Sequence, residues 1–192
     1  LSGGTNRGSG GGGGTYPPLV VNTAGTAALA ATASASAPWC SIAIEVLSKP
    51  YKPGARKVWE QQQNPATYSN ISAYAEGVSS ATGSITAPAG ADVFVIATCD
   101  RTGVPTVTLA GTSLTAVVTA LHNNSATYGG IGIYRAAAAG TGSSQTFVAT
   151  QSGGWVTAYA VAIQQVTAVG STNTSYGQGT TLTHPALGND GM

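Results

Sequence analysis

The chain has 192 residues, of which 42% are hydrophobic and only 7% charged, and its formal net charge is +1. Soluble proteins typically carry roughly 25% charged residues, so uncharged Ser, Thr, Asn, Gln and Gly must cover much of this surface. Such a chain lacks the electrostatic field that attracts nucleic acid or an anionic membrane, and it is too hydrophobic to be disordered. These features favour a protein that packs into an assembly or works outside the cell.

No run approaches the ~20 apolar residues that a membrane span requires, so membrane insertion is not expected. The chain begins at Leu1 without an initiator Met, and no signal-peptide pattern follows. We therefore interpret the sequence as an ordered part of a longer or processed polypeptide.

Residues 1–47 are expected to form a Gly-rich segment followed by the closing strands of a first sandwich-like unit. The run Gly10–Gly14 has no side chains that could pack, which is typical of a flexible linker. It also lacks the Lys-Ser/Thr ending of a phosphate-binding loop. In the stretch Trp39–Val46, every even-numbered residue is apolar, which predicts a half-buried strand.

Residues 48–70 differ in composition and predict a linker or a docking arm. The stretch 48–65 contains three prolines, the triplet Gln61–Gln63 and four of the chain's seven basic residues. Its pattern does not suit a buried core, and its charged side chains would be free to reach a neighbouring subunit. The residues expected to dock between subunits are Lys49, Lys52, Arg56, Lys57 and Trp59.

Residues 71–192 predict a β-sandwich domain, which we expect to be truncated at its C-terminal end. Short apolar stretches alternate here with turns rich in Gly, at the spacing of sandwich strands. The stretch Asp92–Cys99 is apolar on both faces, so it should be a central strand. The predicted strands are Ser72–Glu76, Gly83–Ala87, Asp92–Cys99, Pro105–Ala110, Ser113–Leu121, Tyr128–Ala136, Ser144–Thr150 and Trp155–Val166.

Two further local patterns support an all-β class. The tight turn Gly111–Thr112 between apolar stretches predicts a hairpin. No long segment shows the 3.6-residue period of a helix, although residues 136–139 could form one helical turn. The expected fold is an antiparallel β-sandwich of jelly-roll-like type.

The two ends of the chain resemble each other at a constant offset. Thr5 and Asn6 align with Thr172 and Asn173, 167 positions later, and several glycines align at the same offset. Both segments are rich in Gly and Thr, so some of these matches carry little weight. The pattern favours a tandem arrangement of similar units.

The two cysteines, Cys40 and Cys99, lie far apart in the sequence. Their spacing excludes a metal site of the paired-Cys type. Two interpretations stay open: two buried reduced thiols that pack as small hydrophobic groups, or a single disulfide between neighbouring strands.

The titratable residues do not predict catalysis or a cofactor. No two of the six acidic residues stand at a spacing that guarantees proximity, and His122 and His184 lie in polar, turn-like settings. No Gly-x-Ser-x-Gly nucleophile elbow opens a helix. The sequence therefore predicts a non-enzymatic protein with no metal site and no cofactor.

A weak sugar-binding surface is the one ligand site that the sequence indicates. Its candidate residues are Asn123, Asn124 and Tyr128, and a host glycan would be the partner. Tyr128 and Tyr134 stand at an even spacing, so both are expected to project from one face of a strand. The alternative interpretation is a solvated loop beside a packed tyrosine.

Residues 71–169 resemble the β-sandwich modules of tailed double-stranded DNA bacteriophage virion proteins, of the tail, tail-fibre or capsid-decoration type. The resemblance is carried by the stretches Thr86–Val95, Pro105–Thr115, Ile131–Arg135 and Ser152–Trp155. It implies a virion location, packing against copies of the same chain and other virion proteins, and no cofactor.

Two other classes share the same sandwich physics. One is an extracellular filament subunit or adhesin of a bacterial cell surface, and the other is a secreted carbohydrate-binding module. A sandwich has open strand edges, and an edge with little charge is poorly protected against pairing with a neighbour. In a protein that assembles, such an edge is useful.

Overall fold

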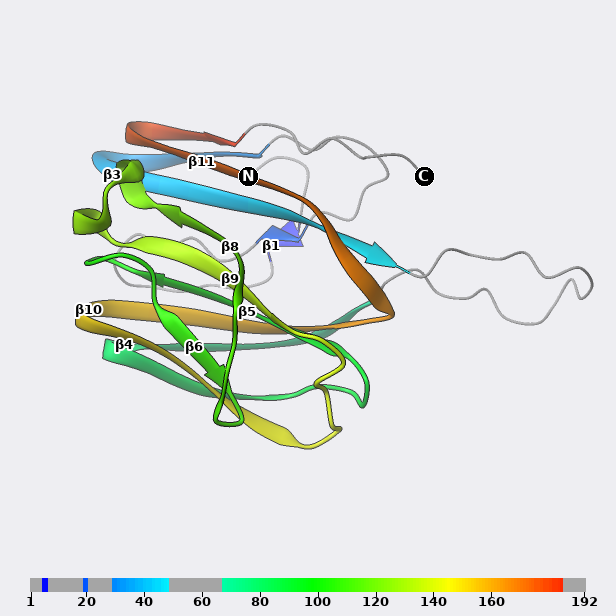
Figure 1. Ribbon diagram of the computed structural model, residues 1–192. Helices are drawn as coiled ribbons and strands as arrows, with labels where there is room; N and C mark the ends of the chain where they lie inside the picture. The colour runs from blue at the N-terminus through cyan, green and yellow to red at the C-terminus, as the bar shows by residue number, and fades with distance from the viewer. Residues whose placement is uncertain (1–4, 7–18, 21–28, 49–66, 185–192) are drawn as a thin grey trace, which may run out of the picture.

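The computed structural model describes residues 5–6, 19–20, 29–48 and 67–184 (Figure 1). In these ranges the regular structure is β, apart from two single-turn 3₁₀ helices, η1 (His122–Asn124) and η2 (Ala126–Tyr128). The strands are β1 (Thr5–Asn6), β2 (Leu19–Val20), β3 (Leu29–Ser48), β4 (Thr67–Thr86), β5 (Asp92–Cys99), β6 (Thr106–Leu109), β7 (Thr112–Ser113), β8 (Ala116–Leu121), β9 (Gly130–Ala136), β10 (Ser144–Gln164) and β11 (Val166–His184). The expected all-β class is confirmed, and the strand pairs are antiparallel. None of the described helices could span a membrane.

The largest sheet has seven strands, in the order β7-β6-β10-β5-β9-β8, with β4 also paired to β10. β4 and β10 bend together: Ser79 and Gly153 have φ angles of 61° and 77°, and the register shifts between Thr150 and Trp155. Beyond the bend, β10 exchanges its neighbour β6 for β5. The sheet is thus folded over on itself, and its two halves face each other (Figure 1).

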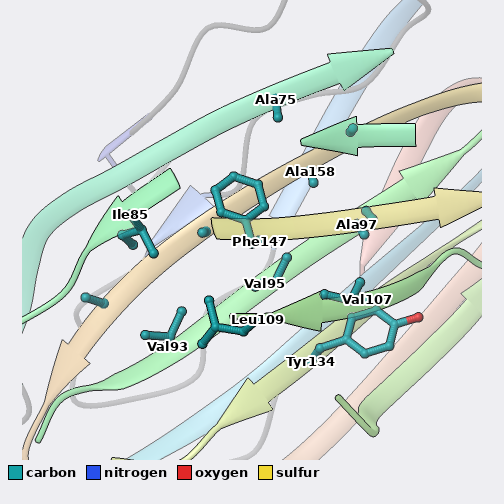
Figure 2. Packing of buried hydrophobic residues seen from close by; sticks show 14 of the residues in the cluster. Ala75, Ile85, Val93, Val95, Ala97, Val107, Leu109, Tyr134, Phe147 and Ala158 are labelled. Carbon is teal, nitrogen blue, oxygen red and sulfur yellow. The ribbon is translucent and has the colours of Figure 1, made fainter. Parts of the chain in front are cut away.

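The main hydrophobic core lies between these two halves. Val93 and Val95 of β5 enter it from one half, and Phe147 of β10 enters it from the other half together with Ile85 and Leu109. Figure 2 shows these side chains gathered in one cluster. Burying a side chain of this size contributes about 1.5–3 kcal/mol to stability. β5 is buried on both faces between β10 and β9, which confirms its predicted central position.

β3 and β11 pair with each other and form a further layer on the outer face of the sheet. Apolar residues of β3, among them Ile42 and Ile44, pack there against Phe94, Ile133 and Val161. The contacts of this layer are mainly with β8, η1 and β9. The layers therefore pack face to face, as in a β-sandwich.

The sequence assigns Trp39–Val46 to a first unit, separate from residues 71–192. In the structure this stretch belongs to β3, which is paired with β11 and packed on the sheet of that second segment. Its alternating pattern does predict a half-buried strand, as found. A pattern of this kind shows which face is apolar, but it does not identify the partner strand.

Two ladders follow one another along the chain: β3 pairs with β11, and β4 pairs with β10. Ser48 pairs with Val166, and Thr67 pairs with Gln164, so the two ends of the segment 49–66 flank Gln165. The segment itself lies outside the described residues. Residues 67–70, which the sequence places in the linker, are part of β4.

Several predicted strand limits change in the structure. Ser72–Glu76 and Gly83–Ala87 fall within the single bent strand β4 apart from Ala87, and Ser144–Thr150 and most of Trp155–Val166 fall within β10. The hairpin turn lies one residue earlier than expected, at Ala110–Gly111, where both φ angles are positive (49° and 79°). Positive φ at both central residues is the hallmark of the type I′ turn that suits strand twist.

A buried carboxylate anchors the turn between β9 and β10. Asp92 Oδ2 accepts a hydrogen bond from Arg135 Nε at 2.6 Å, and Oδ1 accepts one from the Ala138 N–H at 2.8 Å. Gly140 lies so close to Pro88 that a Cβ atom there would come within 2.0 Å of the Pro88 carbonyl oxygen. Only glycine fits this contact.

Candidate functional site

The three sugar-binding candidates of the sequence lie in one loop, between β8 and β9. Asn123 and Asn124 both adopt left-handed backbone angles, with φ of 48° and 52°, a conformation that Asn tolerates well. Asn123 is half-buried, whereas Asn124 and Tyr128 are exposed. The structure therefore brings these residues into a single loop.

The expectation that Tyr128 and Tyr134 share a face is wrong. Tyr128 ends η2, outside a strand, and its side chain is exposed. Tyr134 lies in β9 and is buried in the main core, where its hydroxyl donates to the Pro105 carbonyl. The even spacing fails because the strand begins only at Gly130.

The two cysteines are free thiols. Cys99 is buried and donates to the carbonyls of Arg101 and Gly103, and Cys40 donates to the Ala120 carbonyl at 3.5 Å. Burial raises the pKa of Cys40 to about 12 and also raises the pKa of Cys99. Both thiols are therefore protonated near neutral pH, and neither is an activated nucleophile.

One Ser–His contact exists, but it lacks the features of a hydrolase. Ser41 Oγ lies 2.7 Å from His184 Nδ1. His184 is buried, and its Nε2 has no partner among the described residues, so no carboxylate orients the ring. Burial also lowers the pKa of His184. The described residues contain no group of three or more side chains suited to a metal ion.

The most distinctive surface lies on the outer face of β4 and β10. Three cross-strand pairs follow one another there: Val78 with Trp155, Glu76 with Thr157, and Tyr74 with Tyr159. The intervening residues Ala75, Val156, Ala158 and Ala160 belong to the main core, so these six side chains project from the opposite face. We call the six residues the aromatic face.

The exposed and buried members of the aromatic face have different roles. Val78, Trp155 and Tyr74 are exposed by 69%, 39% and 37%, respectively. Thr157 and Tyr159 are buried between them, with 2% and 5% of their surface accessible. The ring centroids of Tyr74 and Tyr159 are 4.7 Å apart and the rings are inclined at 46°. This contact fixes the position of the Tyr74 ring.

Polar groups occupy the middle of the aromatic face. The Tyr74 hydroxyl donates a hydrogen bond to Glu76 Oε2. The Tyr159 hydroxyl and Thr157 Oγ1 are buried and have no hydrogen-bond partner in the described part of the chain. Burial, and secondarily Glu76, raises the pKa of both Tyr74 and Tyr159, so both phenols stay protonated and can donate.

The aromatic face borders the loop that carries Tyr128. The Trp155 N–H donates to Asp100 Oδ1 at 2.7 Å, and the Gly103 N–H donates to the Ala126 carbonyl at 2.8 Å. The turn at 100–103 therefore stands between Trp155 and the Tyr128 loop. The candidate surface from the sequence and the aromatic face are neighbours at one end of the sandwich.

Sequence reasoning did not single out the aromatic face. It places Trp155 at the start of a predicted strand and assigns no role to Tyr74, Glu76 or Tyr159. The signal was the alternation Trp155, Thr157, Tyr159 along one strand. The pairing with β4, which completes the face, cannot be derived from that alternation.

Comparison with known proteins finds no match: no protein-family model fits the sequence, and no curated protein or solved structure is significantly similar to it. The docking-arm residues Lys49, Lys52, Arg56, Lys57 and Trp59 lie outside the described residues. The function must therefore be inferred from the surfaces described above.

Proposed function

We propose that this protein is a non-enzymatic structural subunit that assembles with copies of itself and with other surface proteins, as a component of a phage virion. Three features support the proposal. The charged fraction is 7%, the outer edge of β4 is long and almost uncharged, and residues 71–169 resemble phage virion modules.

The outer edge of β4 is the observation that carries this proposal. Within the described residues, β4 pairs on one side only, with β10. Its twenty residues contain one charged side chain, Glu76, and no proline. Natural sheets usually protect an edge with charges, prolines or very short strands. Apart from its bend and the single charge of Glu76, β4 has no such protection, which suits a strand that pairs with a second chain.

The layer formed by β3 and β11 offers a similar surface. β11 contains no Asp, Glu, Lys or Arg, and β3 contains only Glu45. Leu47 and Tyr176 of this layer are exposed. A surface with so few charges offers little electrostatic resistance to close packing between copies.

Lysine substitutions on the edge test this proposal. Ser84 of β4 and Thr146 of β10 are directly opposite each other, and both side chains are exposed. Ser84→Lys places a charge on the edge strand, whereas Thr146→Lys places the same charge on the same face one strand inward. We expect the wild type to show concentration-dependent oligomers in sedimentation velocity. We expect Ser84→Lys to reduce them and Thr146→Lys to leave them unchanged.

Two results would contradict the proposal. A wild type that stays monomeric up to its solubility limit would refute self-assembly. Equal loss of assembly in Ser84→Lys and Thr146→Lys would indicate that the copies contact each other through the sheet face and not through the β4 edge. Equal melting temperatures of the three proteins would establish that the fold is intact.

The location is tested in the native source by immunogold electron microscopy. An antibody against residues 49–66 should label capsids or tails regularly if the protein is a virion component. Label on cell envelopes or fibres would instead favour a bacterial filament subunit or adhesin. A second antibody against residues 122–128 provides an independent epitope on a described loop.

A further inference from the structure

We propose that the aromatic face is a binding site for a neutral carbohydrate. This inference does not depend on self-assembly, because one chain supplies all six residues: Tyr74, Glu76, Val78, Trp155, Thr157 and Tyr159. It also differs from the Asn123–Tyr128 loop that the sequence indicates.

The β3–β11 layer does not extend over the aromatic face. The apolar cluster between that layer and the sheet includes Val161 and Ile163 of β10. It does not extend to Tyr159, Thr157 or Trp155, although these residues continue the same face of the strand. The β3–β11 layer thus covers one part of the outer face, and in the aromatic part four of the six side chains, all but Thr157 and Tyr159, are exposed to a ligand.

The aromatic rings are spaced along the face in a way that suits an extended ligand. Trp155 and Tyr159 are four positions apart on β10, which corresponds to about 13 Å along an extended strand. Tyr74 is paired with Tyr159 across the ladder, so exposed rings stand at both ends of the face. An extended ligand with flat apolar surfaces at intervals would contact both ends. The pyranose rings of an oligosaccharide have this character.

Polar groups lie between the rings of the aromatic face. Glu76 offers carboxylate acceptors, and Thr157 and Tyr159 offer hydroxyls that are buried without a partner. Leaving a buried hydroxyl unpaired is unfavourable. Sugar hydroxyls both donate and accept, so one ligand could donate to Glu76 and pair with the hydroxyls of Thr157 and Tyr159. An aliphatic partner would leave the hydroxyls of Thr157 and Tyr159 unsatisfied.

Charge selects among sugars. Glu76 is the only charged residue on the aromatic face, and the face contains no Lys or Arg. Among these six residues, no cation would offset the repulsion between the Glu76 carboxylate and an anionic sugar or a phosphate. A neutral saccharide encounters no such repulsion. A protein strand would bind to the backbone edge of β4, and it would not require the hydroxyls on the face.

Calorimetric titration provides the test. The probes are neutral oligosaccharides of glucose, galactose, mannose and N-acetylglucosamine, with sialylated and sulfated oligosaccharides beside them. We expect saturable binding of at least one neutral probe. Trp155→Ala and Glu76→Gln should each raise its Kd by roughly tenfold or more, because a stacking surface or a charged acceptor is lost. Tyr176→Ala removes an exposed ring elsewhere and should leave the Kd unchanged.

The controls separate binding from folding. Glu76 is exposed, so Glu76→Gln should keep the wild-type melting temperature. Trp155→Phe keeps an aromatic ring and should retain most of the affinity lost in Trp155→Ala. Tyr128→Ala tests the neighbouring loop and should have little effect.

Four outcomes would overturn the inference. These are no binding of any neutral probe, unchanged affinity in both Trp155→Ala and Glu76→Gln, tighter binding of the anionic probes, or a loss that occurs only in Tyr128→Ala. Ser84 lies outside the aromatic face. A Ser84→Lys protein that is monomeric and still binds sugar would therefore show that sugar binding does not depend on assembly.

Discussion

Two large aromatic side chains lie directly over glycines of the neighbouring strand. Phe147 is paired with Gly83 in the main core, and Trp39 is paired with Gly177 in the outer layer. A Cβ atom on Gly83 would stand 2.5 Å from Phe147 Cζ, and one on Gly177 would stand 2.8 Å from Trp39 Cζ2. Each ring occupies space that only glycine leaves free. These glycines therefore shape the packing without forming turns.

Gly83→Ala should lower the free energy of unfolding by about 1–3 kcal/mol, because the added methyl group overpacks the core under Phe147. The effect is measured by equilibrium unfolding in urea. The control is Ser84→Ala, which changes the adjacent, exposed side chain and should shift stability by less than about 0.5 kcal/mol. Equal effects of the two substitutions would mean that Phe147 can move away from Gly83 at little cost.

His184 makes stability depend on pH. Burial lowers the pKa of His184 below its ordinary value, and burial also lowers the pKa of His122 against an opposing contribution from Asp100. The unfolded chain therefore binds more protons than the folded chain just below the ordinary histidine pKa of about 6.5. The stability contributed by the neutral ring is complete above that pH and decreases as the pH falls toward the folded-state pKa.

Urea unfolding between about pH 8 and pH 5 measures this dependence, since the range brackets the ordinary histidine pKa. The free energy of unfolding should decrease on acidification, and His184→Gln should make the decrease smaller. His122→Gln, measured in parallel, gives the part of this decrease that comes from the second histidine. A decrease of the same size in the wild type and in His184→Gln would exclude His184 as the source.

At the scale of elements, two strands determine the architecture by bending. β4 and β10 each pass from one half of the sheet to the other at Ser79 and Gly153, where φ is positive. Gly153 is a residue from which a bend can be expected, but Ser79 is not, because Ser rarely adopts this conformation. The sequence consequently predicts two strands in place of β4. The central strand β5 was predictable because its apolar run is continuous.

The sequence did not predict β11, for a related reason. Its sequence alternates mainly among Thr, Ser, Asn and Gly, so no apolar stripe marks its buried face. It is a strand because β3 pairs with it along its length. The aromatic face was missed for the same physical cause, since it depends on the register between β4 and β10. Local patterns predicted strands here, and long-range pairing determined both the layers and the site.

Gln165 directs β11 away from the sheet. It separates β10 from β11, has a φ of 61° and is exposed. A left-handed conformation costs an ordinary residue about 1–2 kcal/mol, and a β-branched residue tolerates it poorly. Gln165→Gly should therefore raise the free energy of unfolding by up to about 1 kcal/mol, whereas Gln165→Val should lower it by about 1–2 kcal/mol.

Thermal and urea unfolding measure both changes at Gln165. The matched control is Thr172→Val, which introduces the same side chain at an exposed position of β11. That change should lie within about 0.5 kcal/mol of the wild type. If Gln165→Gly destabilised the protein as much as Gln165→Val, the backbone at this junction would not be strained in the way that its φ angle indicates.

At the scale of the whole molecule, the 49–66 segment enters and leaves the sandwich at one point. Its flanking residues Ser48 and Thr67 pair with Val166 and Gln164, two positions apart on the opposite strand. Two residues of a strand span about 7 Å, so a short turn can join the flanking residues directly. The flanking residues are held by their own ladders with β10 and β11, so removal of the segment should leave the packing of the layers unchanged.

Replacing residues 50–65 by a short Gly/Ser turn separates folding from assembly. The segment carries Lys52, Arg56, Lys57 and Trp59, which the sequence assigns to docking between subunits. We expect the shortened protein to keep its melting temperature within a few degrees, because a change of 1 kcal/mol moves it by about 2–4 °C in a chain of this size. We also expect its oligomer mass in sedimentation velocity to fall below that of the wild type.

A second variant keeps the length of the segment and removes three of its four basic charges. Lys52, Arg56 and Lys57 are each changed to Gln, and salt dependence is then compared with that of the wild type. If the segment docks through its cations, added salt should weaken wild-type assembly and have little further effect on the Gln variant, because salt screens exposed charges. Full assembly in both the shortened and the Gln proteins would show that the segment does not dock between subunits. The β4 edge would then remain as the proposed contact between copies. A shortened protein that no longer unfolds cooperatively would instead make the segment part of the fold.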